Sequence, residues 1–179
     1  MCETLVNTLA RGNMIIAAHA GTGKSTLAAM YPDRVIDFVA MPYKYYLDEL
    51  EERAPGSEEV EIRKADPSLI KRIEWPDNYV EAIKETLASG KTLLIPPAWD
   101  VLIPLRVENI PYTLCYPQRD AKEVYRKRYL DRGNSEDFLE IFIGGWEYFL
   151  DSLEKDTYGQ HIVMEPHQFL SDVITCGQE

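Results

Sequence analysis

The chain has 179 residues, of which 45% are hydrophobic, and this is enough to form one globular domain with a buried core. Its 30 acidic and 19 basic residues give a net charge of −11, which opposes general binding to nucleic acid or to an anionic membrane surface. No apolar run approaches the ~20 residues of a membrane span, and the first residues, MCETLVNTLARGN, lack the pattern of a signal peptide. We therefore expect a single cytoplasmic domain over residues 1–179 that binds no membrane.

Five short apolar runs rich in β-branched residues predict buried strands. They are NMIIAA (13–18), RVIDFV (34–39), TLLIPP (92–97), YTLCYP (112–117) and HIVMEP (161–166). Between them lie stretches with helical periodicity, clearest over 77–91, where Val80, Ile83 and Leu87 share a face and Gly90 ends the helix. The alternation of strands and helices predicts an α/β protein with a mainly parallel sheet.

The segment AAHAGTGKST (17–26) joins the first predicted strand to a predicted helix. It matches the phosphate-binding pattern G-x-x-x-x-G-K-[ST], except that Ala18 stands at the first glycine. In such a loop, consecutive N–H groups at the start of a helix point into one concavity that holds phosphates. We expect the ATP-binding residues to be Gly21, Thr22, Gly23, Lys24, Ser25 and Thr26.

Each residue of this segment has an expected role. Lys24 bridges the β- and γ-phosphates, the Ser25 hydroxyl binds Mg²⁺, and Thr26 supports the α-phosphate. His19 stands in the same loop, and we interpret it as an ordinary loop residue rather than a catalytic base.

Several classes of phosphate-loop protein lack support in the remaining sequence. There is no N-K-x-D motif, no L-S-G-G-Q signature and no apolar strand ending in Asp-Glu, which argues against a switch GTPase or a mechanical ATPase. The pattern GTGKST…VID…YPQRDAKEVYRKRYLDRGN…W instead resembles a group of small phage and bacterial phosphate-loop kinases, described as adenylate-kinase-like and related to the kinase half of polynucleotide kinases. The resemblance covers nearly the whole chain, but only the phosphate loop is a specific motif.

This resemblance implies a P-loop NTPase fold, with a five-stranded parallel sheet of order 2-3-1-4-5 flanked by helices. It also implies an acceptor-binding insertion at about 40–77 and a helical lid at about 118–135. Asp37 falls where such kinases carry an aspartate at the end of the second strand. There a carboxylate accepts the proton of an acceptor hydroxyl or holds Mg²⁺ through water.

The end of the third predicted strand departs from the family pattern. Pro96 and Pro97 stand where a polar residue near Mg²⁺ is usual, and Asp100 is the nearest acid. We expect Asp100 to cap the next helix instead. Val39 stands where many relatives have a second acid, two residues after Asp37.

Three arginines carry the prediction of a lid. Arg119 follows the fourth predicted strand, and Arg128 and Arg132 lie four residues apart on one helical face. Planar guanidinium groups suit the spread charge of a phosphoryl group in transfer, so we expect all three to act in catalysis. For any single one of them, pairing at a spacing of up to four residues with Glu123, Asp131 or neighbouring acids is an equally good interpretation.

The aromatic residues have two interpretations. The segment FLEIFIGGWEYFL (138–150) is apolar nearly all round, so we expect a buried helix with Trp146 in the core. The segment MPYKYY (41–46) directly follows the second predicted strand, where it either stacks an acceptor such as a nucleobase or belongs to the core.

The sequence thus favours a Mg²⁺- and ATP-dependent kinase of a nucleoside, a nucleotide or a related small acceptor. One alternative is a kinase for a hydroxyl on a modified base in DNA, such as hydroxymethyluracil, although the net charge disfavours nucleic acid. The other is a non-catalytic nucleotide-binding regulator, suggested by Ala18, Val39 and the Pro96-Pro97 strand end.

Overall fold

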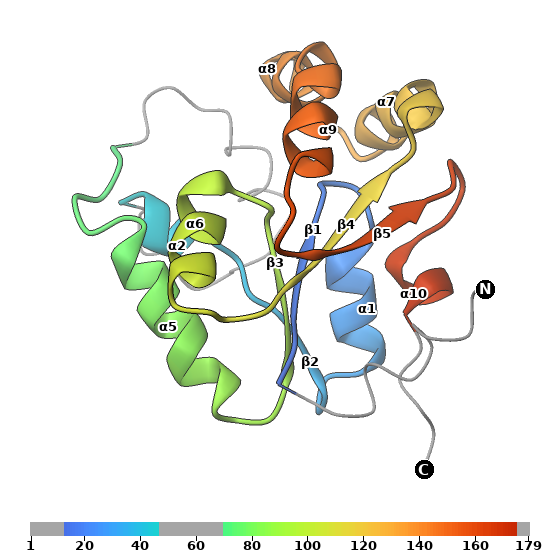
Figure 1. Ribbon diagram of the computed structural model, residues 1–179. Coiled ribbons are helices and arrows are strands. Elements are labelled where there is room, and N and C mark those ends of the chain that lie inside the picture. Colours follow the sequence, from blue (N-terminus) through green and yellow to red (C-terminus); the bar gives the residue numbers. More distant parts are fainter. Residues whose placement is uncertain (1–12, 47–69, 175–179) are drawn as a thin grey trace.

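The structure is a computed structural model that describes residues 13–46 and 70–174 (Figure 1). Its strands are β1 (Ile15–Ala18), β2 (Val35–Asp37), β3 (Thr92–Ile95), β4 (Thr113–Pro117) and β5 (Gln160–Met164). Its helices are α1 (Lys24–Met30), α2 (Met41–Lys44), α5 (Asp77–Leu87), α6 (Trp99–Val107), α7 (Lys122–Asp131), α8 (Glu136–Leu139), α9 (Trp146–Glu154) and α10 (Leu170–Val173), with a 3₁₀ turn η3 (Arg119–Ala121) and a π-helical turn η4 (Glu140–Gly144). Much of the predicted acceptor-binding insertion, residues 47–69, lies outside the described residues.

The strands form one parallel sheet with the order β2-β3-β1-β4-β5. β1 lies at the centre, where Ile16 aligns with Leu94 of β3 and with Thr113 of β4. Each apolar run of the sequence overlaps one observed strand. The predicted α/β architecture, with its parallel sheet of order 2-3-1-4-5 flanked by helices, is therefore confirmed.

Alternate residues of the central strand face opposite sides of the sheet. Ile15 and Ala17 pack in the cluster that includes buried residues of α5, α6, α7 and α9, whereas Ile16 and Ala18 pack against residues of α1 and α10. Figure 1 shows α5 and α6 on one side of the sheet and α1 and α10 on the other. Because both faces are covered, the buried strands β1, β3 and β4 are continuous runs rather than alternating ones. The prediction of a buried strand is wrong for β5, which lies at the edge of the sheet and is buried only at Met164.

The helix predicted over residues 77–91 is confirmed as α5. Val80 and Ile83 are buried, Leu87 packs at the margin of the core, and Gly90 lies beyond the helix end with a φ of 81°. A positive φ of this size favours glycine, which explains why the chain turns there.

The segment after α7 is more broken than its apolar sequence suggests. Trp146 is fully buried, as predicted, and the expected helix over 138–150 is present as three successive pieces, α8, the π-helical turn η4 and α9. Ile141 and Tyr148 are also exposed. Ile141 lies in η4, where it lines a cavity instead of packing in the core.

The carboxyl ends of β1, β2 and β3 meet at one edge of the sheet, which is where open parallel sheets usually bind ligands. Among the described residues, no helix combines the length and the apolar character needed to cross a bilayer.

Candidate functional site

The phosphate-loop segment lies between the end of β1 and the start of α1. Gly21 and Gly23 have φ values of 76° and 91°, in the left-handed region that glycine tolerates best. Gly23 is the N-cap of α1 and forms no side-chain cap, so the first N–H groups of the helix face the loop without a capping side chain. Ala18 ends β1 in extended backbone, so its methyl group is compatible with this turn.

Two side chains hold the loop in shape from within. The Lys24 ammonium donates hydrogen bonds to the carbonyl oxygens of Ala18 (3.0 Å) and His19 (3.2 Å). The buried Thr22 hydroxyl donates to the His19 carbonyl oxygen at 2.7 Å. Among the predicted ATP-binding residues, Thr22 therefore has a buried side chain that bonds within the loop, whereas the residues Ser25 and Thr26 are exposed.

Asp37 reaches the phosphate loop from the neighbouring strand end. It is the last residue of β2, and its Oδ2 accepts a hydrogen bond from the Ser25 hydroxyl at 2.7 Å. An alcohol oxygen beside a carboxylate is a donor set that suits Mg²⁺, which keeps several waters and takes few protein ligands when phosphates are present. Within residues 13–46 and 70–174, no cluster of three acidic, histidine or cysteine side chains could hold a metal alone.

His19 is buried inside an aromatic enclosure. Its ring meets those of Tyr125, Phe142, Trp146 and Phe149 edge-on, with centroids 5.6 to 6.1 Å apart. Its Nδ1 lies 3.0 Å from the Ala20 carbonyl oxygen, which requires Nδ1 to carry the proton. Burial lowers the pKa of His19 to about 4, although this hydrogen bond raises it, and nearby Lys24 lowers it further. The imidazole is therefore neutral near pH 7 and connects the loop to the helices above it.

Arg119, the first predicted lid arginine, points toward α9. Its guanidinium forms ion pairs with Glu147, Asp151 and Glu154, with N–O distances of 2.5 to 2.6 Å. The hydrogen bonds to Glu154, Asp151 and Glu147, in that order, raise the pKa of Arg119. Its charge is therefore already compensated by three carboxylates of α9, and not by acids near it in the sequence, as the alternative interpretation expected.

Arg128, the second lid arginine, does lie against the phosphate loop. It donates hydrogen bonds to the carbonyl oxygens of Gly21 (3.2 Å), Pro166 (3.1 Å) and Gln168 (3.2 Å). Its guanidinium carbon also lies 4.0 Å from the centroid of the Phe169 ring. Arg128 thus ties α7 and the segment after β5 to the loop.

Arg132, the third lid arginine, is the half-buried C-cap residue of α7, and its N–H donates to the Arg128 carbonyl oxygen at 3.1 Å. Neither Arg119, Arg128 nor Arg132 lines the cavity described next.

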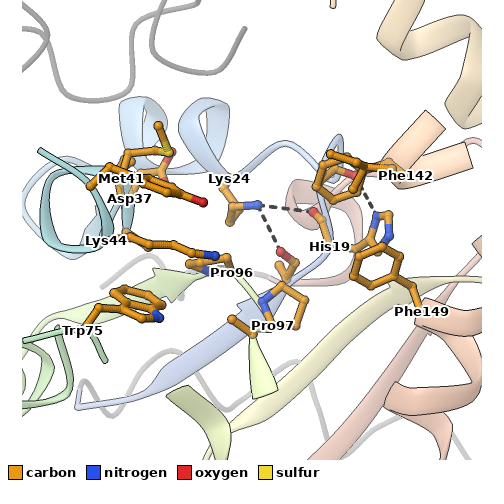
Figure 2. A pocket seen from close by; sticks show the side chains of 17 residues that line it. His19, Lys24, Asp37, Met41, Lys44, Trp75, Pro96, Pro97, Phe142 and Phe149 are labelled. Carbon is orange, nitrogen blue, oxygen red and sulfur yellow. Dashed lines mark hydrogen bonds between the residues drawn. The ribbon is translucent and has the colours of Figure 1, made fainter. Parts of the chain in front are cut away.

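A cavity of about 340 Å³ opens beside the phosphate loop (Figure 2). Its polar lining includes Lys24, Asp37 and Lys44, and its apolar lining includes Phe142 and Phe149. Sequence reasoning missed both phenylalanines, which lie seven residues apart on η4 and α9. The sequence shows that this segment is rich in aromatic residues. It does not show the π-helical turn η4, nor that the two phenylalanine rings line the cavity.

Pro96 and Pro97 form part of the cavity wall at the end of β3. The predicted cap by Asp100 is wrong, because Ala98 is the N-cap of α6 and receives no side-chain hydrogen bond. Asp100 Oδ2 instead accepts a hydrogen bond from Trp75 Nε1 at 2.6 Å and so fixes an indole that lines the cavity.

The aromatic residues of segment 41–46 lie in different surroundings, and Tyr46 is exposed. Tyr43 packs at the core in tilted ring contacts with Phe38 and Tyr79, with centroids 5.6 and 5.2 Å away, whereas Tyr45 lines the cavity.

In comparisons with known proteins, no family model matches the chain, and neither does any curated protein sequence.

Proposed function

We propose that this protein is a P-loop kinase that transfers the γ-phosphoryl group of Mg²⁺-bound ATP to a nucleoside, a nucleotide or a related small acceptor. The observation that carries this proposal is that Lys24 and Asp37 line one cavity, while Asp37 also bonds the Ser25 hydroxyl at 2.7 Å. The groups suited to hold a triphosphate and the group suited to activate an acceptor therefore lie around the same space.

The loop supplies the elements that a triphosphate needs. N–H groups at the start of α1 favour negative charge, and Lys24 can exchange its bonds to the Ala18 and His19 carbonyl oxygens for phosphate oxygens. Mg²⁺ would be held by the Ser25 hydroxyl with phosphates and water. When bound, the ion neutralises charge on the phosphates.

Asp37 is suited to receive the proton of an acceptor hydroxyl. The acceptor oxygen forms a bond to the γ-phosphorus, the bond to the β-bridging oxygen breaks, ADP leaves with that electron pair, and the hydroxyl proton goes to the Asp37 carboxylate. Because Asp37 ends β2 and is half-buried, its carboxylate faces the cavity from a fixed backbone position.

The cavity walls favour a small acceptor with an apolar, flat part. Trp75, Phe142 and Phe149 supply aromatic surface, and Pro96 and Pro97 supply a rigid apolar wall. A volume of about 340 Å³ lies within the range of small-molecule sites, about 300 to 1,000 Å³.

A screen for transfer tests this proposal. Purified protein with Mg²⁺ and ATP is offered nucleosides, nucleotides and DNA containing hydroxymethyluracil, and the product is detected by mass spectrometry. We expect a phosphorylated small molecule from the unchanged protein and no product from Lys24→Ala. Lys127→Ala is the control and should give full product, because Lys127 is exposed and pairs with Asp131. If DNA is the only compound that becomes phosphorylated, the acceptor is a modified base in DNA and not a small molecule.

A non-catalytic nucleotide-binding regulator is the second candidate. It is favoured by Pro96 and Pro97, which place no acid at the end of β3, and by Arg119, whose charge is compensated by α9. Tight binding of Mg²⁺ and ATP with no transfer to any compound of the screen would support this candidate against the kinase.

A further inference from the structure

Lys44 is a second cation at the cavity, and the proposed transfer of phosphate from ATP gives it no role. It ends α2, is half-buried, and lines the cavity with Lys24 and Asp37. Its ammonium lies 5.5 Å from the centroid of the Tyr45 ring and 5.4 Å from that of the Trp75 ring. In the part of the chain that the structure describes, no carboxylate forms an ion pair with it.

The backbone around Lys44 is held in place from two sides. The Lys44 carbonyl oxygen accepts a hydrogen bond from the Arg72 N–H at 2.8 Å, and the Asn78 side chain donates to the Tyr43 carbonyl oxygen at 2.8 Å. The indole of Trp75 below the ammonium is fixed by Asp100 at 2.6 Å. Lys44 therefore occupies a prepared position rather than a loose surface one.

Among the residues of 13–46 and 70–174 that line the cavity, the charges leave a positive excess. Lys24 and Lys44 contribute two positive charges and Asp37 one negative charge, whereas His19 is neutral because burial lowers its pKa to about 4. The net charge of the whole chain is −11. A positive cavity in an acidic protein attracts anions locally, and once ATP occupies Lys24, the charge that remains for a second anion is that of Lys44.

The two ends of the cavity differ in chemistry. Figure 2 shows Lys44 and Trp75 at one end and Phe142 and Phe149 at the other, with Lys24 between them. A ligand that fills this space places an apolar part against the phenylalanines and an anionic group at the ammonium.

We propose that Lys44 binds a phosphate or carboxylate group of the acceptor, so that the acceptor is a small organic anion with a flat apolar part. This inference rests on the proposed function, because it assigns Lys44 to the substrate of that reaction. A half-buried ammonium on aromatic rings has lost part of its hydration, and a charge-assisted hydrogen bond that it donates to an anion compensates for that loss.

Matched pairs of compounds test the role of Lys44 by calorimetric titration in buffer with saturating Mg²⁺ and ADP. One pair is 4-(hydroxymethyl)benzoate and 1,4-benzenedimethanol, and the other is thymidine 5′-monophosphate and thymidine. Both members of each pair carry a hydroxyl, and the pairs separate a carboxylate from a phosphate. The variants are Lys44→Met, Lys44→Arg and the control Lys71→Gln, which changes an exposed lysine that pairs opposite Tyr45 and does not line the cavity.

We expect the unchanged protein to bind the anionic member of at least one pair about 10-fold more tightly than the neutral one, which is the scale of one hydrogen bond to a charged group. Lys44→Met should abolish this preference, and Lys44→Arg and Lys71→Gln should keep it. Equal binding of both members in both pairs, including no binding of either, would overturn the inference, as would a preference that survives Lys44→Met.

A third arm uses a short DNA duplex at physiological salt. Duplex binding that is lost in Lys44→Met, without any preference in the two pairs, would show that Lys44 serves a nucleic-acid backbone, and the small acceptor would be wrong. Failure of Mg²⁺ and ATP to bind refutes the proposed function. If Mg²⁺ and ATP bind but the unchanged protein shows no anion preference, or if the preference survives Lys44→Met, only the role of Lys44 is refuted.

Discussion

The buried imidazole of His19 makes a prediction about stability at mildly acidic pH. Its pKa is lowered from 6.5 to about 4 in the folded protein, chiefly by burial among aromatic rings. Because the unfolded chain binds this proton more readily than the folded one, stability is lost as the pH falls through the window between these two values.

The magnitude follows from the two pKa values. At pH 5 the unfolded imidazole is almost fully protonated and the folded one is mostly neutral, so lowering the pH from 7 to 5 should cost about 2 kcal/mol. The full loss, reached below about pH 4, is about 3 kcal/mol. A loss of this size is a large part of the stability of a typical domain, about 5 to 15 kcal/mol.

Urea unfolding at pH 7 and at pH 5 measures this loss in the unchanged protein, in His19→Gln and in His167→Gln. The exposed His167 is the matched control, so its replacement should leave the difference between the two pH values intact. In His19→Gln the difference should shrink by about 2 kcal/mol, whatever the stability of the variant at pH 7. The reasoning is refuted if both variants lose equal stability, or if the imidazole of His19 titrates near 6.5 by NMR in the folded protein.

Three further substitutions test the phosphate loop and its surroundings. Asp37→Asn should keep the affinity for ATP and lower kcat by about 10²-fold with the true acceptor, and an unchanged kcat would exclude Asp37 as the proton acceptor. Gly21→Ala should lower the melting temperature more than Gly90→Ala, because both glycines have positive φ but a methyl group at Gly21 meets a tyrosine ring carbon at 2.8 Å, whereas nothing lies within 4 Å at Gly90. Equal shifts would contradict the close packing around the loop. Arg128→Ala should cost about 2 kcal/mol in urea unfolding, because its hydrogen bonds to three carbonyl oxygens are lost, and a neutral change would show that those contacts do not hold the loop.

The sheet could be predicted from the sequence because each strand overlaps a local apolar run, and central strands such as Ile15–Ala18 are covered on both faces. The order of the strands was not contained in those runs and came from the resemblance to small kinases. The phosphate loop was also a local pattern, since Gly23, Lys24 and Ser25 are adjacent in the chain.

The lid and the cavity depend on contacts that are distant in sequence. Arg119 pairs with acids 28 to 35 residues later, whereas the sequence offered only nearby acids as its partners. Asp100 was the nearest acid to a helix start, but the indole of Trp75 reaches it from 25 residues earlier. Sequence patterns therefore located the charged groups, and tertiary packing decided which of them face the cavity.

Calorimetric titration of Mg²⁺ and ATP into the unchanged protein, Lys24→Ala and Lys127→Ala tests the central claim most directly. The Lys24 ammonium lies across the loop, 3.0 Å from the Ala18 carbonyl oxygen, where it can turn to the phosphates. We predict that Lys24→Ala weakens ATP binding by about 10-fold or more, the scale of a lost charge-assisted contact, and that Lys127→Ala binds as the unchanged protein does. Equal ATP affinity in all three proteins, each folded by circular dichroism, would contradict the assignment of this loop to phosphate.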